Sequence, residues 1–207
     1  MNTKLCNLEK LCKENPKIID WNLLSTITLP EEFIDKFENE LNWQLLCMYQ
    51  TFSSNMLMKY FNKLDWDLIS EFQKLSKNDI MRFRNKLNWK YISKSQRLSE
   101  DIIDKFNDRV DWNSISMVQK LSEDFIRKYK NKVNWSYISR FQDISEEFIE
   151  EFEYYVDWEY IGGKHQKLSE YFISRYADKI NWKNVLRYQT LSGEFIYKFK
   201  NELKLVV

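Results

Sequence analysis

The sequence is poor in the residues from which turns, metal sites and catalytic sets are built. Its 207 residues include only three glycines and two prolines, whereas a protein made of β-hairpins needs glycine or Asn-Gly at its turns. A single histidine, His165, nearly excludes a His-based metal site, and it is the one residue that could serve in a Ser–His–Asp triad. The glycines at 162, 163 and 193 form no phosphate-binding loop. We therefore expect helices, no enzyme activity, and no metal or other cofactor.

Neither sign of charge is in excess. The 32 Lys and Arg against 31 Asp and Glu leave a net charge of +1, whereas a dedicated nucleic-acid-binding domain usually has a basic excess. The three cysteines, Cys6, Cys12 and Cys47, include no CxxC pair, and an odd number is a poor disulfide framework. No apolar run approaches the ~20 residues of a membrane span, and the N-terminus lacks the apolar core of a signal peptide. We expect a soluble, cytoplasmic protein without a membrane partner.

The tryptophans reveal an internal repeat. All eight recur at intervals of 22 to 24 residues, and each follows an Asp or Asn. A Ser precedes most of them by thirteen residues, an aromatic residue precedes them by six, and a Gln follows by seven or eight. The best-formed copy, residues 121–142, reads LSEDFIRKYKNKVNWSYISRFQ. The residue before Trp alternates strictly between Asp and Asn, for which the sequence offers no reason, since either residue caps a helix.

Each copy has the start and stop signals of two helices. The Ser is an N-cap, the acids that follow it, such as Glu123, favour the positive end of the helix dipole, and Leu121 and Ile126 have the spacing of a hydrophobic staple. Asn131, nine residues after the Ser, tolerates the left-handed conformation and predicts the end of this longer first helix. The Asp or Asn before Trp then predicts a short second helix, α or 3₁₀, of about two turns.

One such pair of helices cannot bury its own apolar faces, whereas stacked pairs can. We therefore predict an all-α fold, an α-solenoid of about eight two-helix repeats that forms one continuous domain. Residues 1–28 are predicted to be a divergent N-terminal capping repeat, residues 29–191 the tandem repeats, and residues 192–207 a C-terminal capping half-repeat.

The LSE-x-FI start and [DN]-W-x-x-I centre of the copy at 121–142 resemble a short Trp-containing helical repeat of giant-virus, phage and bacterial proteins. The resemblance covers residues 29–203. It implies contacts with another protein and brings no catalytic residues with it. The expected function is accordingly a non-enzymatic scaffold for protein–protein interaction, as a viral or phage factor that engages a host protein in the host cytoplasm. A structural or self-assembling element is an alternative.

Several ladders recur at fixed repeat positions. We interpret the Gln ladder as bonding to backbone at the corners between repeats, and the Trp ladder as core. A third ladder is basic and would track a phosphate backbone, which makes nucleic-acid binding an alternative function. Its members are Lys36, Lys59, Arg82, Lys105, Lys128, Arg175 and Lys198. In the competing interpretation the cations form surface pairs on their own helices, because the residue four positions earlier is often acidic, as Asp124 stands before Lys128.

The copy at 145–168 departs most from the pattern. Tyr154 replaces the helix-ending Asn, Tyr155 replaces the usual Lys, Glu151 inverts the basic ladder, and one residue is inserted just before His165. Adjacent tyrosines on a normally polar edge are typical of protein contacts. Our hypothesis is that Tyr154, Tyr155, Glu151 and His165 lie at the partner-binding surface, and the competing interpretation is drift of the repeat.

Overall fold

The computed structural model describes residues 3–200, and within that range the chain forms helices and no strand. It divides into two compact units, residues 1–96 and 97–207, which are described separately. The predicted all-α repeat fold is confirmed. The three predicted segments and their union in one domain stay predictions, and the end of the C-terminal half-repeat, residues 201–207, lies outside the described residues.

The helices follow one another with short connections, except across residues 152–169 of the second unit, where no helix forms. Those of the first unit are α1 (Thr3–Glu14), η1 (Pro16–Ile18), α2 (Trp21–Ser25), α3 (Glu31–Lys36), α4 (Trp43–Tyr49), α5 (Ser54–Lys59), α6 (Trp66–Phe72), α7 (Lys77–Phe83) and α8 (Trp89–Ser95). Those of the second unit are α9 (Glu100–Lys105), α10 (Trp112–Val118), α11 (Glu123–Lys128), α12 (Trp135–Phe141), α13 (Glu146–Glu151), α14 (Glu170–Arg175), α15 (Trp182–Tyr188) and α16 (Gly193–Lys198).

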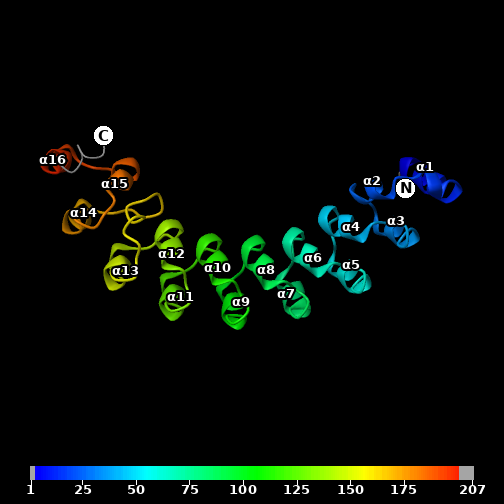
Figure 1. The fold of residues 1–207 in the computed structure, drawn as a ribbon, viewed down its shortest axis with the longest axis horizontal. Coiled ribbons are helices and arrows are strands. Elements are labelled where there is room, and N and C mark those ends of the chain that lie inside the picture. Colours follow the sequence, from blue (N-terminus) through cyan, green and yellow to red (C-terminus); the bar gives the residue numbers. More distant parts are fainter. Residues whose placement is uncertain (1–2, 201–207) are drawn as a thin grey trace. The chain divides into compact units, whose positions relative to one another are not determined.

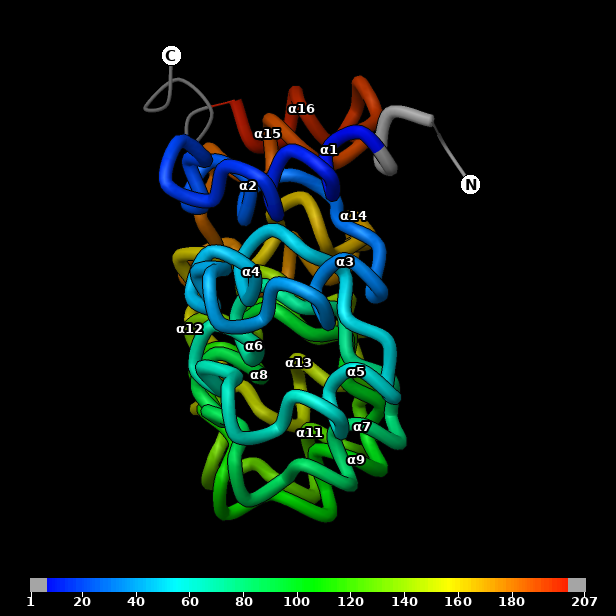
Figure 2. The backbone as a smooth tube through the Cα atoms, turned by 90° about the vertical axis from the view of Figure 1, so that its right-hand side faces the viewer, coloured from blue at the N-terminus to red at the C-terminus, as the bar shows by residue number. Residues whose placement is uncertain are grey.

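Within each unit the helices form two rows. The helices that follow the capping Ser, here called first helices, lie in one row, and those that begin at Trp, here called second helices, lie in the other (Figures 1 and 2). In the first unit α2 packs on α4, α4 on α6 and α6 on α8, and in the second unit α10 packs on α12. Fully buried side chains come from both rows, among them Phe148 in α13 and Ile138 in α12. Each unit is therefore a stretch of α-solenoid whose copies bury their apolar faces against their neighbours.

The predicted helix starts are confirmed by their hydrogen bonds. Ser53 Oγ accepts from the Met56 amide at 3.2 Å, and Ser76 forms a full capping box with Asp79. The same bond is made by Ser122, Ser145, Ser169 and Ser192. Ser99 alone among these serines makes no side-chain cap within the described residues. Before Trp43, Asn42 accepts amides of the second helix, as Asp or Asn does in the other copies that form a second helix.

The predicted end of the first helix is wrong. First helices have six or seven residues and so are not the longer ones, and no residue other than glycine has a positive φ in the described chain. The aromatic residue ends the helix instead. Tyr129 has φ −111° and ψ 26°, and its carbonyl accepts the amides of Lys132 at 2.8 Å and Val133 at 3.0 Å. The helix thus ends at Tyr129, two residues before Asn131. The bonds to the Tyr129 carbonyl and the burial of Val133 hold the corner that follows, so a left-handed residue is not required.

The tryptophans tie each corner to the next copy. Trp112 Nε1 donates to the Asn107 carbonyl at 3.0 Å, and the indole ring lies 4.7 Å from the Tyr129 ring of the following copy. The same indole bond to the carbonyl five residues earlier is made by all eight tryptophans. The Trp ladder therefore packs between copies, but among the eight tryptophans, all within the described residues, only Trp89 is buried and the others are half-buried. The ladder lies at the edge of the core and not inside it as predicted.

The Gln ladder has the register role that we predicted. Gln142 Oε1 accepts from the Leu121 amide at 3.1 Å, and its Nε2 donates to the carbonyls of Ser116 and Gln119 at 2.9 and 2.8 Å. Because Ser116 and Gln119 belong to the preceding copy, whereas Leu121 begins the copy that Gln142 ends, a slip of one residue between copies would break the two bonds from Nε2.

A buried Ser ladder, which the sequence analysis did not single out, makes a second set of bonds between copies. Ser70 is fully buried, donates to the Trp66 carbonyl at 2.6 Å and accepts from the Asn88 amide at 2.9 Å. Cys47 occupies this position in its own copy and accepts from the Asp65 amide. Burial raises the pKa of the Cys47 thiol to about 11, so this cysteine is a structural substitute for Ser.

The Asp–Asn alternation before Trp has a physical cause in the stacking. Each Asn donates from Nδ2 to a residue one position past the Trp of the preceding copy, as Asn88 donates to Asp67 Oδ1 at 2.9 Å. The acceptors for the other three are Asn22, Asn113 and Glu159. Asp157 faces a donor instead, Ser136 Oγ at 2.9 Å. Each of the four Asn side chains therefore faces an acceptor of the preceding copy, and Asp157 faces a donor.

Candidate binding groove

The basic ladder is largely neutralised, but between copies rather than along one helix. Lys128 bonds to Asp104 of the preceding first helix, whereas Asp124 pairs with Arg127 at 2.9 Å. The other cations with a carboxylate partner are Lys59 with Asp35, Arg175 with Glu150, and Lys36 with Glu9. Arg82 contacts the Met58 sulfur. Arg82, Lys105 and Lys198 of this ladder form no described ion pair within residues 3–200.

Two of these pairs include a tyrosine. Lys59 and Tyr60 both donate to Asp35, and these hydrogen bonds hold the pKa of its carboxyl below the usual value. Burial, and then the bond to Asp35, raises the pKa of the Tyr60 hydroxyl. Lys128 lowers the pKa of Asp104 in the same way in the second unit. The paired cations of this ladder are thus part of the scaffold.

The structure separates the four residues of the partner-surface hypothesis. Glu151 accepts from Arg127 Nε at 2.7 Å. The acid thus stands where other copies have the cation of the pair, and Arg127 stands where they have the acid. Tyr155 packs its ring 5.2 Å from Trp135, where other copies place a Lys over Trp. Both residues therefore stabilise the stacking.

Tyr154, by contrast, is 90% exposed, and its hydrogen bond with Glu153 raises the pKa of its hydroxyl. Tyr154 and Tyr155 lie in the corner before Trp158, whereas His165 lies in the corner after it. No described contact joins Tyr154 to His165 within residues 3–200. Of the four residues, His165 is the one that lines a cavity.

The irregular copy has lost its second helix. Residues 158–163 form turns in place of the α-helix that the regular copies have there. Gly162 takes the place of the buried Ser with φ +84°, and a Cβ on it would lie 3.1 Å from Val185 Cγ2. A Cβ on the inserted Gly163 would lie 2.9 Å from the Tyr160 carbonyl oxygen. Glycine is therefore needed at both positions, and the turns that it permits leave a gap in the row of second helices.

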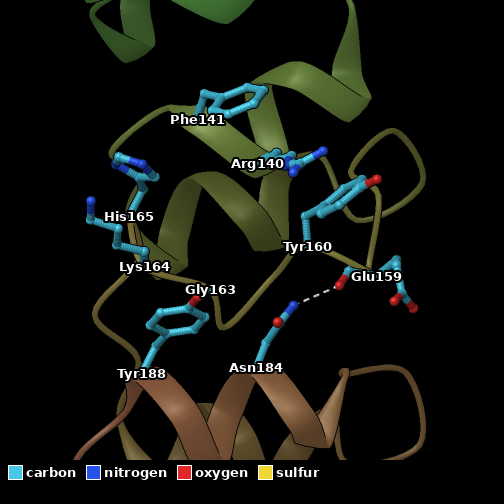
Figure 3. Close-up of a pocket in the computed structure, with 9 residues that line it drawn as sticks. All are labelled: Arg140, Phe141, Glu159, Tyr160, Gly163, Lys164, His165, Asn184 and Tyr188. Atoms are coloured by element: carbon cyan, nitrogen blue, oxygen red, sulfur yellow. Dashed lines mark hydrogen bonds between the residues drawn. The ribbon is translucent and has the colours of Figure 1, made fainter.

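A groove of about 290 Å³ opens at this gap (Figure 3). It is lined by Arg140, Phe141, Glu159, Tyr160, Gly163, Lys164, His165, Asn184 and Tyr188, which come from three successive copies. The Arg140 guanidinium lies 5.1 Å from the ring centroids of both Phe141 and Tyr160, and these cation–π contacts fix its position. Asn184 Nδ2 donates to the Glu159 carbonyl at 2.8 Å and so ties α15 to the turns.

A second hollow of about 230 Å³ adjoins the groove and shares Phe141 and His165 with it. Its other lining residues are Met117, Val118, Gln119, Lys120, Leu121, Gln142 and Asp143. His165 Nδ1 lies 3.6 Å from Asp143 Oδ1. Together the two hollows extend the surface along the outward side of the second helices.

Arg140, Lys164 and Arg187 occupy the same repeat position in three consecutive copies. All three are exposed, and none forms a described ion pair within residues 3–200. A ring follows each of them in sequence: Phe141, His165 and Tyr188. Unpaired cations beside aromatic faces suit carboxylates that are flanked by apolar groups. Reading this position down the aligned copies was the signal that could have identified these residues from the sequence.

Comparison of the chain with protein-family models, with curated proteins and with solved structures finds no match in any of the three. Among the described residues, no helix has the length and apolar composition to cross a bilayer. Within the same range, no group of three or more His, Cys, Asp and Glu side chains is placed to hold a metal ion. We therefore interpret the groove from the residues that line it.

Proposed function

We propose that the chain is a non-enzymatic binding protein, and that the groove at the irregular copy holds an acidic segment of a partner protein. The observation that carries this proposal is the contrast between two sets of cations. The paired cations on the first helices are used by the scaffold, whereas Arg140 and Lys164 are exposed and line the groove with Phe141, Tyr160 and Tyr188. Arg187 lies beside the groove, with its guanidinium 5.4 Å from the Tyr188 ring.

The cationic groove supports an acidic ligand because charge complementarity gives specificity and speeds association. Exposed aromatic rings and Arg are enriched where proteins bind one another. A cavity of about 290 Å³ suits one or two side chains of an extended segment. That the chain is a viral or phage factor acting on a host protein in the cytoplasm stays a prediction from the sequence resemblance.

Peptide display tests the proposal without a known partner. Random peptides would be selected on the wild-type protein and on a groove variant, Arg140→Glu with Lys164→Glu and Arg187→Glu. A matched control reverses three exposed lysines elsewhere in the second unit, Lys105→Glu with Lys130→Glu and Lys198→Glu. We expect acidic peptides to be enriched by the wild-type protein and by the control but not by the groove variant.

Two results would overturn the proposal. One is that no peptide is enriched, or that the enriched peptides bind the groove variant equally well while circular dichroism shows both variants folded. The other is tight, salt-dependent binding of a labelled single-stranded RNA that the control variant loses, because that pattern belongs to a nucleic-acid protein that uses the basic ladder.

A further inference from the structure

The two adjoining hollows differ in charge. Arg140 and Lys164 bring two cations to the first hollow, and both side chains are exposed. Glu159 belongs to the same lining, but its carboxylate accepts from Asn181 Nδ2 at 2.7 Å and so is already engaged. The first hollow therefore keeps an excess of positive charge, and it is the part of the surface that attracts the carboxylates of an acidic segment.

The second hollow has an apolar wall and no excess of either charge among its Lys, Arg, Asp and Glu residues. Lys120 and Asp143 are both exposed and have opposite signs. Met117 and Val118 at the end of α10 and Phe141 at the end of α12 form the apolar wall. Because Val118 is 45% exposed, an apolar side chain placed in this hollow would remove apolar surface of both molecules from water.

The two hollows belong to one strip of surface. Phe141 and His165 line both hollows, Val118 lines the second, and Tyr188 lines the first. These four residues come just before the ladder Gln in four consecutive copies, so the repeat places them in one row. An extended segment that follows this row passes from the cations into the apolar hollow.

We infer that the acidic segment carries a bulky apolar side chain as a second determinant of binding. Its carboxylates bind at Arg140 and Lys164, and the apolar side chain fills the second hollow against Val118 and Phe141. This hollow of about 230 Å³ has room for one large side chain. The inference rests on the proposed function and adds the apolar residue to it.

Two labelled peptides of equal charge test this second determinant. EEEEFEEEE and EEEESEEEE differ only in the central residue, and the glutamates on both sides assume no particular spacing between acid and apolar group. Fluorescence anisotropy would measure the affinity of each peptide for the full chain. We expect the Phe peptide to bind about tenfold more tightly than the Ser peptide, and both to lose affinity on the groove variant but not on the three-lysine control.

Two further variants locate the apolar side chain. Val118→Ser removes part of the apolar wall and is compatible with the fold, because Ser95 already ends α8 at this repeat position. Phe72→Ser is the matched control, since Phe72 ends α6 at the same position, is 47% exposed and lines neither hollow. We expect Val118→Ser to abolish most of the preference for the Phe peptide without changing the affinity for the Ser peptide, and Phe72→Ser to change neither.

The inference can fail while the proposed function stands. Equal binding of the two peptides, with both lost on the groove variant, would overturn the apolar determinant and leave the acidic groove in place. A preference that survives Val118→Ser, or that Phe72→Ser also abolishes, would overturn it as well, and so would enrichment of displayed acidic peptides without apolar residues. Binding of neither peptide, nor of any displayed acidic peptide, would overturn both. Circular dichroism would establish that each variant is folded.

Discussion

At the scale of single residues, Asn88 makes two contacts that can be separated. Its Oδ1 caps α8 by accepting from the Lys90 amide at 3.1 Å, and its Nδ2 donates to Asp67 Oδ1 of the preceding copy. Asn88→Asp keeps the cap, because Asp is an equally good N-cap, but it places the new carboxylate directly against the carboxylate of Asp67. Since the pair is exposed, we expect the free energy of unfolding to fall by only about 1 kcal/mol, measured by urea titration at pH 7.

The same change at Asn134 is the matched control. Asn134 Nδ2 donates to Asn113 Oδ1 at 2.8 Å, and Asn113 can rotate its amide to offer a donor to a new carboxylate. Asn134→Asp should therefore cost less than Asn88→Asp. Adding Asp67→Asn to Asn88→Asp should restore stability. Equal losses at both sites would show that donor–acceptor matching does not explain the alternation.

At the scale of the element, the buried Ser ladder fixes each second helix to the next corner. Ser70→Ala leaves the Asn88 amide without its acceptor, which costs about 1–3 kcal/mol for a buried group. Ser70→Cys is the control, because Cys47 already fills this place in another copy with the Asp65 amide as its donor. We expect Ser70→Ala to lower the thermal midpoint clearly and Ser70→Cys to retain most of it; a larger loss for Cys than for Ala would contradict this account.

The features that the sequence predicts correctly depend on residues that are close together in the chain. The caps at Ser53 and Asn42 depend on amides two or three residues away, and the repeat length is read directly from the spacing of the tryptophans. Partners in other copies depend on how far one copy is offset from the next, which no single copy contains. For that reason Lys128 was paired with Asp124 instead of Asp104.

The same distinction between local features and contacts between copies applies to the candidate site. The insertion before His165 marked the right copy, because a change in repeat length is visible in the sequence. The convergence of Arg140 and Tyr188 on the groove was not predicted, since these residues come from different copies and meet only where a helix between them is lost.

At the scale of the whole molecule, a repeat array is held together by contacts between neighbouring copies, so a local fault should stay local. Gly162→Ala provides such a fault. An L-residue at φ +84° costs roughly 1–2 kcal/mol, and the new methyl group must also displace Val185. Hydrogen exchange should show lost protection in α12 and α15, while amides of α4 and α6 in the first unit keep theirs.

Gly193→Ala is the matched control for this prediction. Gly193 begins α16, and a Cβ there meets no atom within 4 Å, so the change should be neutral or stabilising by up to about 1 kcal/mol. The Cys47 thiol, buried in the first unit, gives an independent readout, because it should react with a thiol reagent no faster in Gly162→Ala than in wild type. Faster labelling of Cys47 together with lost protection in α4 would mean that the strain at Gly162 is felt cooperatively along the chain, and nearest-neighbour energetics would then not describe this protein.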